Sequence, residues 1–297
     1  MKPLVFAFPD DVDIARKMVA ELGAGEGAVD WHRFPDRESL MTLRGECAGR
    51  DVIFVCTLTD PDSKALPLHF CAATARDLGA RKVGLVAPYL GYMRQDQQFS
   101  PGQSRSARDF AKFLSGSFDW LVTADPHLHR IEKLGEVFSI PAIAASSMPA
   151  VTDWIKRSVP DPVIIGPDRE SAQWAQRVAQ SLDVPWTALE KIRSGDRDVK
   201  VSAPDPQIIR NRNPVIIDDI VSSGRTLAET LIALRAQGAP EVTCVIVHAL
   251  FAAGAEAALR SAGARRIVSS NTVAHSTNAI DVAPLLVAAM TPLLSSN

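Results

Sequence analysis

Several features are missing from this sequence, and their absence narrows what the protein can be. No run of about 18 apolar residues occurs in the chain of 297 residues, so we expect no membrane-spanning helix. Cysteine is scarce: its 4 positions, Cys47, Cys56, Cys71 and Cys244, show no CxxC spacing and three lie in apolar surroundings, which favours buried free thiols over a disulfide or metal site. Neither sign of charge dominates, since 34 acidic residues face 32 basic ones and leave a net charge of −2, so nothing in the composition points to nucleic acid. Acidic residues also interrupt the N-terminus before a signal-peptide core could form, and we expect a cytoplasmic protein.

Two common nucleotide-binding motifs are absent as well. The sequence contains no GxxxxGK[ST], which excludes a Walker A loop. Residues 23–28, GAGEGA, fit the pattern GxGxxA, but they follow a helical pattern and not a strand. A dinucleotide fingerprint requires a strand before its glycines, so we do not expect residues 23–28 to bind a dinucleotide.

What the sequence does contain is an alternation of short apolar runs with longer helical patterns, typical of parallel sheets covered by helices on both faces. We predict strands at residues 52–58, 82–88, 119–125, 162–166, 214–218, 242–250 and 266–271. Apolar residues recur at helical spacing between them, at Ala175, Val178, Ala179 and Leu182 and again at Leu227, Leu231 and Leu234. The length fits two compact α/β domains, with a boundary expected near residues 139–149.

The segment VIIDDIVSSGRTLAET, residues 215–230, carries the clearest chemical signal. Ligands of open parallel sheets bind beyond the carboxyl ends of the strands, where we place Asp218 and Asp219. The small-residue loop that follows and the start of the next helix offer backbone N–H groups and a positive dipole end, which together favour phosphate. The two carboxylates would repel phosphate and suit hydroxyl groups or a cation, so a sugar phosphate meets both demands. A helix N-cap beside solvated aspartates is the purely structural alternative.

This loop resembles the ribose 5-phosphate loop of type I phosphoribosyltransferases, and five further motifs narrow the resemblance. They are RFPDRE (33–38), PYLGYMRQDQQFSPGQSRSARDFAKFL (88–114), TADPHLH (123–129), GPDRES (166–171) and LEKIRSG (189–195). In this order and spacing, together with the tail NTVAHSTNAIDVAPLL, they resemble the ribose-phosphate pyrophosphokinases, and the FSPG and SSG segments look closer to the archaeal type. The resemblance runs over nearly the whole chain.

The resemblance implies a fold and an activity. The expected fold is α/β, with two tandem type I phosphoribosyltransferase-like domains, each a mainly parallel sheet flanked by helices: residues 1–145 on the ATP side and residues 146–297 on the ribose 5-phosphate side, with a C-terminal tail that could pack on the first domain. The implied reaction is Mg²⁺-dependent transfer of diphosphate from ATP to the 1-hydroxyl of ribose 5-phosphate, giving AMP and phosphoribosyl pyrophosphate. A homo-oligomer is also implied, with no nucleic-acid or membrane partner.

Site residues follow from the matching motifs. The resemblance implies that catalysis involves Lys191, Arg193 and His127, that ATP binds at Phe34, Asp36, Glu38, Arg94, Gln95 and Asp96, and that ribose 5-phosphate binds at Asp218, Asp219, Ser222, Ser223, Gly224, Arg225 and Thr226. Magnesium is expected at His127 and Asp168. Cations that converge on the transferred group suit a reaction in which positioning and charge stabilisation dominate.

Four positions depart from the family pattern. Arg37 stands where glycine is usual, Pro126 where leucine is usual, Gln103 where an acid is usual and Arg225 where glycine is usual. Two alternatives therefore stay open. A catalytically weak or inactive paralogue that regulates an active synthetase would explain the departures together. A phosphoribosyltransferase would share residues 218–226, yet it would not need the RQD and FPDRE motifs.

Overall fold

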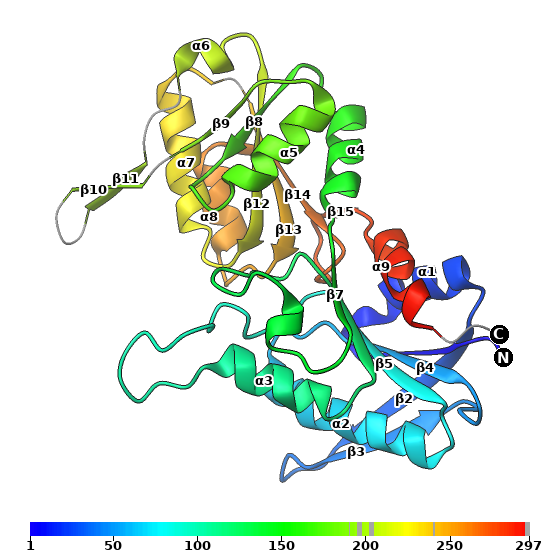
Figure 1. The fold of residues 1–297 in the computed structure, drawn as a ribbon. Coiled ribbons are helices and arrows are strands. Elements are labelled where there is room, and N and C mark those ends of the chain that lie inside the picture. The colour runs from blue at the N-terminus through cyan, green and yellow to red at the C-terminus, as the bar shows by residue number, and fades with distance from the viewer. Residues whose placement is uncertain (190, 195–197, 202–204, 240, 295–297) are drawn as a thin grey trace. The chain divides into compact units, whose positions relative to one another are not determined.

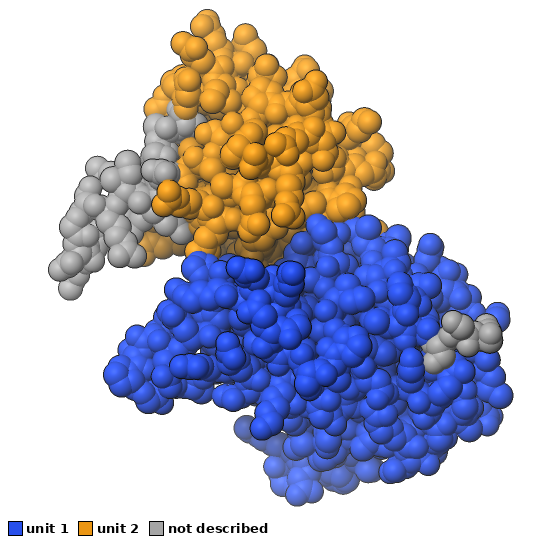
Figure 2. Space-filling view, viewed as in Figure 1, with its two compact units in different colours: residues 1–146, 272–274, 282–297 blue, residues 147–271, 275–281 orange. Residues whose placement is uncertain are grey.

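The computed structural model describes residues 1–189, 191–194, 198–201, 205–239 and 241–294, with only the backbone described for 191–194 and 198–201. The chain divides into two compact units, coloured in Figure 2: unit 1 comprises Met1–Ser146, Thr272–Ala274 and Val282–Asn297, and unit 2 comprises Ser147–Asn271 and His275–Asp281. Both units are α/β, as the sequence predicted. In the part of the chain that is described, no helix has the length and apolar character needed to cross a membrane.

Unit 1 is built on a seven-stranded sheet in the order β3-β2-β1-β4-β5-β6-β7. Its strands are β1 (Leu4–Ala7), β2 (Gly25–Arg33), β3 (Ser39–Arg44), β4 (Asp51–Val55), β5 (Lys82–Ala87), β6 (Trp120–Ala124) and β7 (Ala142–Ala145). All neighbours run parallel except β2 and β3, which form an antiparallel hairpin. The central strands β4 and β6 are buried at every position, which is why they read as continuous apolar runs in the sequence.

Helices cover both faces of this sheet (Figure 1). They are α1 (Val12–Leu22), α2 (Pro61–Asp77), α3 (Ser106–Ser115) and α9 (Ala283–Met290), with short 3₁₀ turns at Pro9–Asp11, Leu134–Glu136 and Thr291–Leu293. On one face α9 lies beside α1, and Leu286 and Met290 of α9 are fully buried in the same apolar cluster as Met18 and Val122. The last helix of the chain thus completes the core of the N-terminal unit.

Unit 2 repeats the plan with a six-stranded, fully parallel sheet in the order β15-β14-β13-β12-β8-β9. Its strands are β8 (Pro162–Gly166), β9 (Trp186–Ala188), β12 (Asn213–Val221), β13 (Val242–Ala249), β14 (Ala264–Ser270) and β15 (Asn278–Ile280), and a separate antiparallel ribbon joins β10 (Lys191–Ser194) to β11 (Asp198–Val201). The helices are α4 (Met148–Ser158), α5 (Ala172–Leu182), α6 (Pro206–Ile209), α7 (Arg225–Ala236) and α8 (Ala255–Ala262).

The helical spacing predicted for α5 and α7 is confirmed. Ala175, Val178 and Ala179 of α5 are buried against one face of the unit 2 sheet, in the cluster that includes Trp154 of α4. Leu227, Leu231 and Leu234 of α7 are buried with Leu259 of α8 in a second cluster. Each helix therefore buries its apolar stripe and exposes its polar side.

The glycine-rich segment at residues 23–28 connects a helix to a strand. Helix α1 ends at Leu22, Gly23 adopts the left-handed conformation with φ of 58°, and β2 begins at Gly25. This is the reverse of the strand–loop–helix order that a dinucleotide site needs, so the sequence-based exclusion of such a site is confirmed.

Candidate active site

The FPDRE motif forms the tight turn between β2 and β3. The N–H of Phe34 donates to the carbonyl of Glu38 at 2.9 Å, and the N–H of Arg37 donates to the carbonyl of Phe34 at 2.9 Å. Asp36 shapes the turn as well, because its Oδ1 accepts from the N–H of Glu38 at 3.1 Å. Because β2 runs parallel to β1, the turn lies at the carboxyl edge of the unit 1 sheet. The side chain of Phe34 is 41% exposed there, as a base-stacking residue would need to be.

Arg37 stands where glycine is usual in the family, and its backbone conformation there is unfavourable for a residue with a side chain. Its φ is 74°, in the left-handed region where a side chain costs about 1–2 kcal/mol. The turn keeps its shape despite the substitution, and Arg37 lines a cavity of about 550 Å³ together with Asp36, Glu38 and the first turns of α2.

We expect Arg37→Gly to raise the free energy of unfolding by about 0.5–1 kcal/mol, because the relief of left-handed strain exceeds the added freedom of glycine in the unfolded chain. Thermal unfolding would measure the change. Arg33→Gly, at a position with no positive φ, is the matched control and should lower stability. A loss of stability in both variants would contradict the strain assigned to Arg37.

The RQD motif follows β5 and is tied to the loop that follows β6. Asp96 is buried at 8% exposure, and its carboxylate accepts from the backbone N–H of Arg130 at 3.0 Å and from Nη1 of Arg130 at 3.2 Å. Gln95 accepts from the hydroxyl of Ser106 at 2.7 Å, at the first residue of α3. Arg94, by contrast, is exposed. Gln95 and Asp96 therefore hold the loop in shape, but only Asp96 is buried, and Arg94 and Gln95 are both exposed.

His127 lies in the loop after β6 that Arg130 anchors. Its ring lies 6.4 Å from the ring of His129, with the planes 20° apart. Asp125, just before it, has a φ of 28°, and its N–H donates to the carbonyl of Ala145 at 2.9 Å. Pro126 is buried between them. The left-handed backbone at Asp125 precedes the half-buried His127, and the Asp96–Arg130 ion pair follows it. Together they fix the position of the His127 backbone.

In unit 2, Asp168 lies in the loop between β8 and α5. Its Oδ1 accepts from the N–H groups of Glu170 and Ser171 at 3.2 and 3.1 Å, and from the hydroxyl of Ser171 at 3.2 Å. Ser171 is fully buried just before α5. One carboxylate oxygen of Asp168 therefore organises the entry to the helix, which fixes the orientation of the carboxyl group as a metal ligand would require.

Asp218 and Asp219 lie inside β12, which corrects the predicted strand end at residue 218. The strand continues to Val221, with Asp218 opposite Ile246 and Ile220 opposite His248 of β13. The correction has a physical reason, because parallel pairing with β13 continues past the acids. Asp219 is buried at 5% exposure, and its Oδ1 accepts from the N–H of Ile220 at 2.8 Å, whereas Asp218 is half-buried.

The SSGRT segment starts as a short loop at residues 222–224 and continues into α7, whose first residues are Arg225 and Thr226. Gly224 caps the helix with a φ of 72°, a left-handed conformation that favours glycine. Ser222 and Ser223 are exposed, and the carbonyl of Ser222 accepts from the N–H of Ala252 at 3.0 Å. The loop therefore presents the N-terminus of a 12-residue helix, a favourable position for an anion.

Arg225 is held along the helix. Its Nε donates to Oε1 of Glu229, one turn further on, at 2.9 Å. The side chain of Arg225 is 75% exposed, so this ion pair is weak. The arginine that replaces the usual glycine can therefore be accommodated without filling the loop.

Lys191 and Arg193 occupy alternate positions of β10, opposite Val201 and Val199 of β11. Their side chains lie outside the part of the structure that is described. The two residues thus belong to a two-stranded ribbon separate from the unit 2 sheet.

The magnesium ligands predicted from the sequence are His127, which belongs to unit 1, and Asp168, which belongs to unit 2. Among the described residues, no group of three or more His, Cys, Asp or Glu side chains is arranged to hold a metal. Magnesium bound to a nucleotide needs few protein ligands, because waters and phosphate oxygens complete its shell.

The sequence did not identify a further group of residues that lies near the SSGRT segment. A cavity of about 450 Å³ is lined by Phe251, Ala252 and His275, and Ala252 is the residue bonded to Ser222. The ring of His275 lies 4.9 Å from that of Phe251, and its Nδ1 is 2.8 Å from the hydroxyl of Thr277. The only indication of His275 and Thr277 in the sequence was the tail NTVAHSTN, which contains both. The fold is needed to show that this tail lies beside Phe251 and Ala252 in the loop after β13.

Two mainly parallel sheets, each flanked by helices and each with polar motifs at its carboxyl edge, place the chain in the class of phosphoribosyltransferase-type proteins. Residues 138–284 match the profile of the phosphoribosyl transferase domain, and residues 4–117 match that of the N-terminal domain of ribose phosphate pyrophosphokinase. The chain belongs to the ribose-phosphate pyrophosphokinase family, which places it among the enzymes that transfer diphosphate groups.

Similar proteins cover the chain almost completely. The ribose-phosphate pyrophosphokinase of Methanopyrus kandleri is 31% identical over 95% of this chain and 96% of its own, and that of Halobacterium salinarum is 31% identical over 93% and 96%. The crystal structure of phosphoribosylpyrophosphate synthetase from Mycobacterium smegmatis matches with a TM-score of 0.84 over 99% of both chains at 21% identity. The sequence-based recognition of the family and of its fold is thereby confirmed.

Proposed function

We propose that this protein transfers the diphosphate of ATP, as its Mg²⁺ complex, to the 1-hydroxyl of ribose 5-phosphate, forming phosphoribosyl pyrophosphate and AMP. The observation that carries the proposal is the similarity to ribose-phosphate pyrophosphokinases along nearly the whole chain. The arrangement of residues 215–230 supports it, because the loop at residues 222–224 leads from β12, which contains Asp218 and Asp219, into helix α7.

In this proposal unit 2 binds the acceptor. The phosphate of ribose 5-phosphate would lie on Ser222, Ser223, Gly224, Arg225 and Thr226, where backbone N–H groups at the start of α7 favour an anion. The ribose hydroxyls would donate to Asp218 and Asp219, since carboxylates bind hydroxyls through strong charge-assisted hydrogen bonds. The attacking 1-hydroxyl would then be held at the carboxyl edge of the sheet.

Unit 1 would bind the donor. Phe34 and Arg94 are exposed and offer an aromatic face and a planar guanidinium to the adenine, while Asp36 and Glu38 shape the turn that presents Phe34. Gln95 and Asp96 would act by fixing the loop that carries Arg94.

The remaining residues would handle charge on the transferred group. Lys191, Arg193 and His127 would stabilise the diphosphate as it passes between the two oxygens, and His127 and Asp168 would contact the magnesium ion that the nucleotide brings. Homo-oligomer formation is part of the proposal too. Exposed apolar side chains on α2 and α3, namely Leu66, Phe70 and Phe113, support it.

The decisive experiment is incubation of the purified protein with ATP, magnesium and ribose 5-phosphate, followed by chromatography of the products. Equimolar AMP and phosphoribosyl pyrophosphate are the expected result. Binding of ribose 5-phosphate without either product would contradict the proposal and favour a regulatory subunit.

We expect Asp219→Asn to weaken the binding of ribose 5-phosphate by roughly tenfold, because a neutral amide forms weaker hydrogen bonds to the ribose hydroxyls than a carboxylate. Titration calorimetry would measure the dissociation constant. The control is Asp183→Asn, which makes the same charge change at the C-terminal end of α5. This variant should bind ribose 5-phosphate as wild type does. Equal affinity in the two variants would leave the acidic pair with a structural role only.

A further inference from the structure

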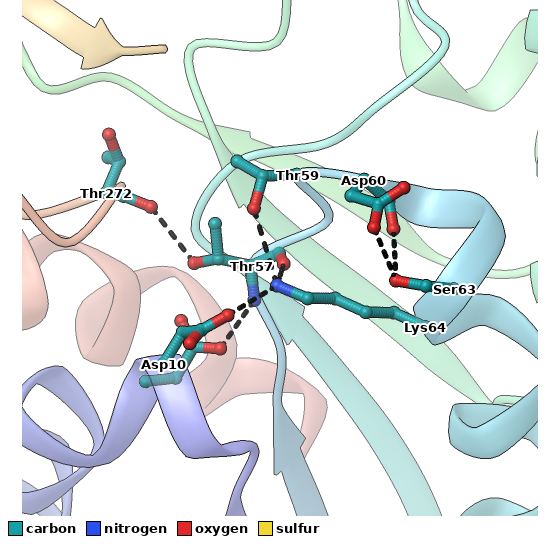
Figure 3. Close-up of polar contacts among 8 residues, drawn as sticks. Asp10, Thr57, Thr59, Asp60, Ser63, Lys64 and Thr272 are labelled. Carbon is teal, nitrogen blue, oxygen red and sulfur yellow. Dashed lines mark hydrogen bonds and ion pairs between the residues drawn. The ribbon is translucent and has the colours of Figure 1, made fainter. Parts of the chain in front are cut away.

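A buried lysine fixes the start of helix α2 in unit 1 (Figure 3). Lys64, only 7% exposed, donates to the carboxylate of Asp10 at 2.9 Å, to the carbonyl of Thr57 at 2.9 Å and to the hydroxyl of Thr59 at 3.3 Å. Three acceptors surround the ammonium group, which is what a buried lysine requires. Thr57 is itself held, because its N–H donates to Oδ2 of Asp11 at 2.8 Å. The first turn of α2 is therefore attached to the carboxyl edge of the unit 1 sheet.

Asp62 lies in this first turn, between two residues that contact each other. The hydroxyl of Ser63 lies 2.8 Å from Oδ2 of Asp60 and 3.0 Å from its carbonyl oxygen, and both contacts are drawn in Figure 3. The side chain of Asp62 is exposed. Its carboxylate therefore extends into solvent from a backbone that is fixed on both sides.

The carboxylate of Asp62 binds Tyr92, in the loop that carries the RQD motif. The hydroxyl of Tyr92 donates to Oδ1 of Asp62. This hydrogen bond raises the pKa of Tyr92, so the hydroxyl stays protonated and keeps its hydrogen for the carboxylate. The contact joins the start of α2 to the segment after β5, and Arg94 follows Tyr92 by two residues.

Tyr92 needs this contact because its backbone conformation is unfavourable. Its φ is 66°, in the left-handed region that residues with large side chains rarely adopt, so the surrounding contacts must hold it there. The ring packs against Phe110 of α3 with 4.9 Å between the centroids, and the carbonyl accepts from the N–H of Gln95 at 2.8 Å. Tyr92 also borders a cavity of about 520 Å³ that Asp62 and Asp109 line. Packing therefore does not enclose the ring, and the hydrogen bond to Asp62 supplies the remaining constraint.

We infer that Asp62 is a positioning residue, which acts through Tyr92 to place Arg94 for the adenine of the diphosphate donor. The inference rests on the proposed function, in which the exposed guanidinium of Arg94 stacks on the base. If Tyr92 is released, its backbone can return to a negative φ, and this rotation displaces Arg94. Because stacking requires the two planes to be in contact, the displacement weakens nucleotide binding. In this scheme Asp62 and Tyr92 contact neither substrate.

The test measures binding of the magnesium complex of ATP by titration calorimetry, in the absence of ribose 5-phosphate. Tyr92→Phe removes the hydroxyl and keeps the ring, Asp62→Ala removes the acceptor, and Asp62→Asn keeps an oxygen that can accept. Asp109→Ala is the matched control, because it also removes an acid from the first turn of a helix and from the same cavity. The hydroxyl of Tyr92 has a single hydrogen, which it donates to Asp62.

We expect Tyr92→Phe and Asp62→Ala each to raise the Kd and the KM for ATP by roughly fivefold with kcat within about twofold, because the lost hydrogen bond affects binding and not the chemical step. The double variant should bind no more weakly than the weaker single variant, since both remove the same bond. Asp62→Asn and Asp109→Ala should stay within about twofold of wild type. The affinity for ribose 5-phosphate should stay within about twofold in every variant, because the proposed acceptor residues all belong to unit 2.

Tyr92→Phe is the decisive variant. Asp62 also lines the cavity of about 550 Å³ beside the FPDRE turn, so its replacement alters that cavity as well. Unchanged affinity for ATP in Tyr92→Phe would overturn the inference. An equal loss of affinity for ribose 5-phosphate would overturn it too, because it would indicate a general loss of structure. If Asp62→Ala does not fold, the comparison of Tyr92→Phe with Asp109→Ala still decides.

Hydrogen exchange separates this inference from the proposed function. In Tyr92→Phe the N–H of Gln95, which donates to the carbonyl of residue 92, should exchange faster than in wild type, whereas Asp109→Ala should leave its rate unchanged. If wild type binds no ATP, the proposed function fails, but the exchange rate still tests whether Asp62 holds the loop. Equal exchange at Gln95 in Tyr92→Phe and wild type would show that it does not.

Discussion

Replacing Lys191 by alanine is expected to lower kcat by roughly a thousandfold while the affinity for ribose 5-phosphate stays within about twofold. The reason is that a cation on the transferred diphosphate acts mainly where charge builds up in the transition state, and loss of one such group removes about 10²–10³ in rate. The proposed acceptor site, in contrast, lies on β12 and α7 and does not include Lys191. Single-turnover kinetics with ATP and ribose 5-phosphate, together with calorimetry, would separate the two effects.

The β10–β11 ribbon supplies its own control. Lys200 stands opposite Ile192 in the register, next to the Lys191–Val201 pair. Lys200→Ala removes the same charge from the same ribbon and should keep kcat within about twofold. A similar loss in both variants would show that the ribbon contributes general positive charge, and an unchanged kcat in Lys191→Ala would remove this residue from the proposed mechanism.

The second large effect concerns stability and pH. Burial raises the pKa of Asp11 from 3.8 to about 6, so between these values the folded protein holds a proton that the unfolded chain has lost. The contribution of Asp11 to the free energy of unfolding is therefore largest below pH 3.8 and is lost as the pH rises to about 6. At about 1.4 kcal/mol per unit of pKa, the loss amounts to about 3 kcal/mol.

Asp11→Asn should remove this dependence, because the amide keeps an oxygen for the N–H of Thr57 and does not titrate. Urea denaturation at half-unit steps between pH 4 and 7 would measure it, and the stability of Asp11→Asn relative to wild type should rise by about 3 kcal/mol across that range. Asp13→Asn, exposed and two residues further along, should run parallel to wild type. Parallel profiles for Asp11→Asn and wild type would contradict the raised pKa.

Much of the fold could be predicted because its central strands are buried on both faces. Strands such as β5 and β8 lie where the apolar runs placed them. The β2–β3 hairpin was missed because its residues are mostly half-buried or exposed, so no continuous apolar run marks it, and because β2 contains Gly25 and Gly27. Strand β7 is only four residues long, with the sequence AIAA, and lies within the segment expected to hold the domain boundary, so too few side chains mark it as a strand.

The site was predictable as a set of motifs but not as a set of contacts. The sequence identified RQD as a unit, yet only the fold reveals that Asp96 binds Arg130 of the next loop. It also drew attention to Arg225 without showing its pairing with Glu229. Lys64 gave no signal at all, because a lysine one turn into a helix is usually solvated, and its burial depends on acceptors contributed by Asp10 and Thr57.

The covering of unit 1 by helix α9 has a consequence for how the protein is made. Translation delivers the strands of unit 1 first, but Leu286 and Met290, which close one face of that sheet, are synthesised only after the whole of unit 2. A nascent chain on the ribosome can thus complete the sheet of unit 2 while the earlier sheet still exposes Val5, Ile53 and Val122. The unit whose synthesis begins first is therefore the last to complete its core.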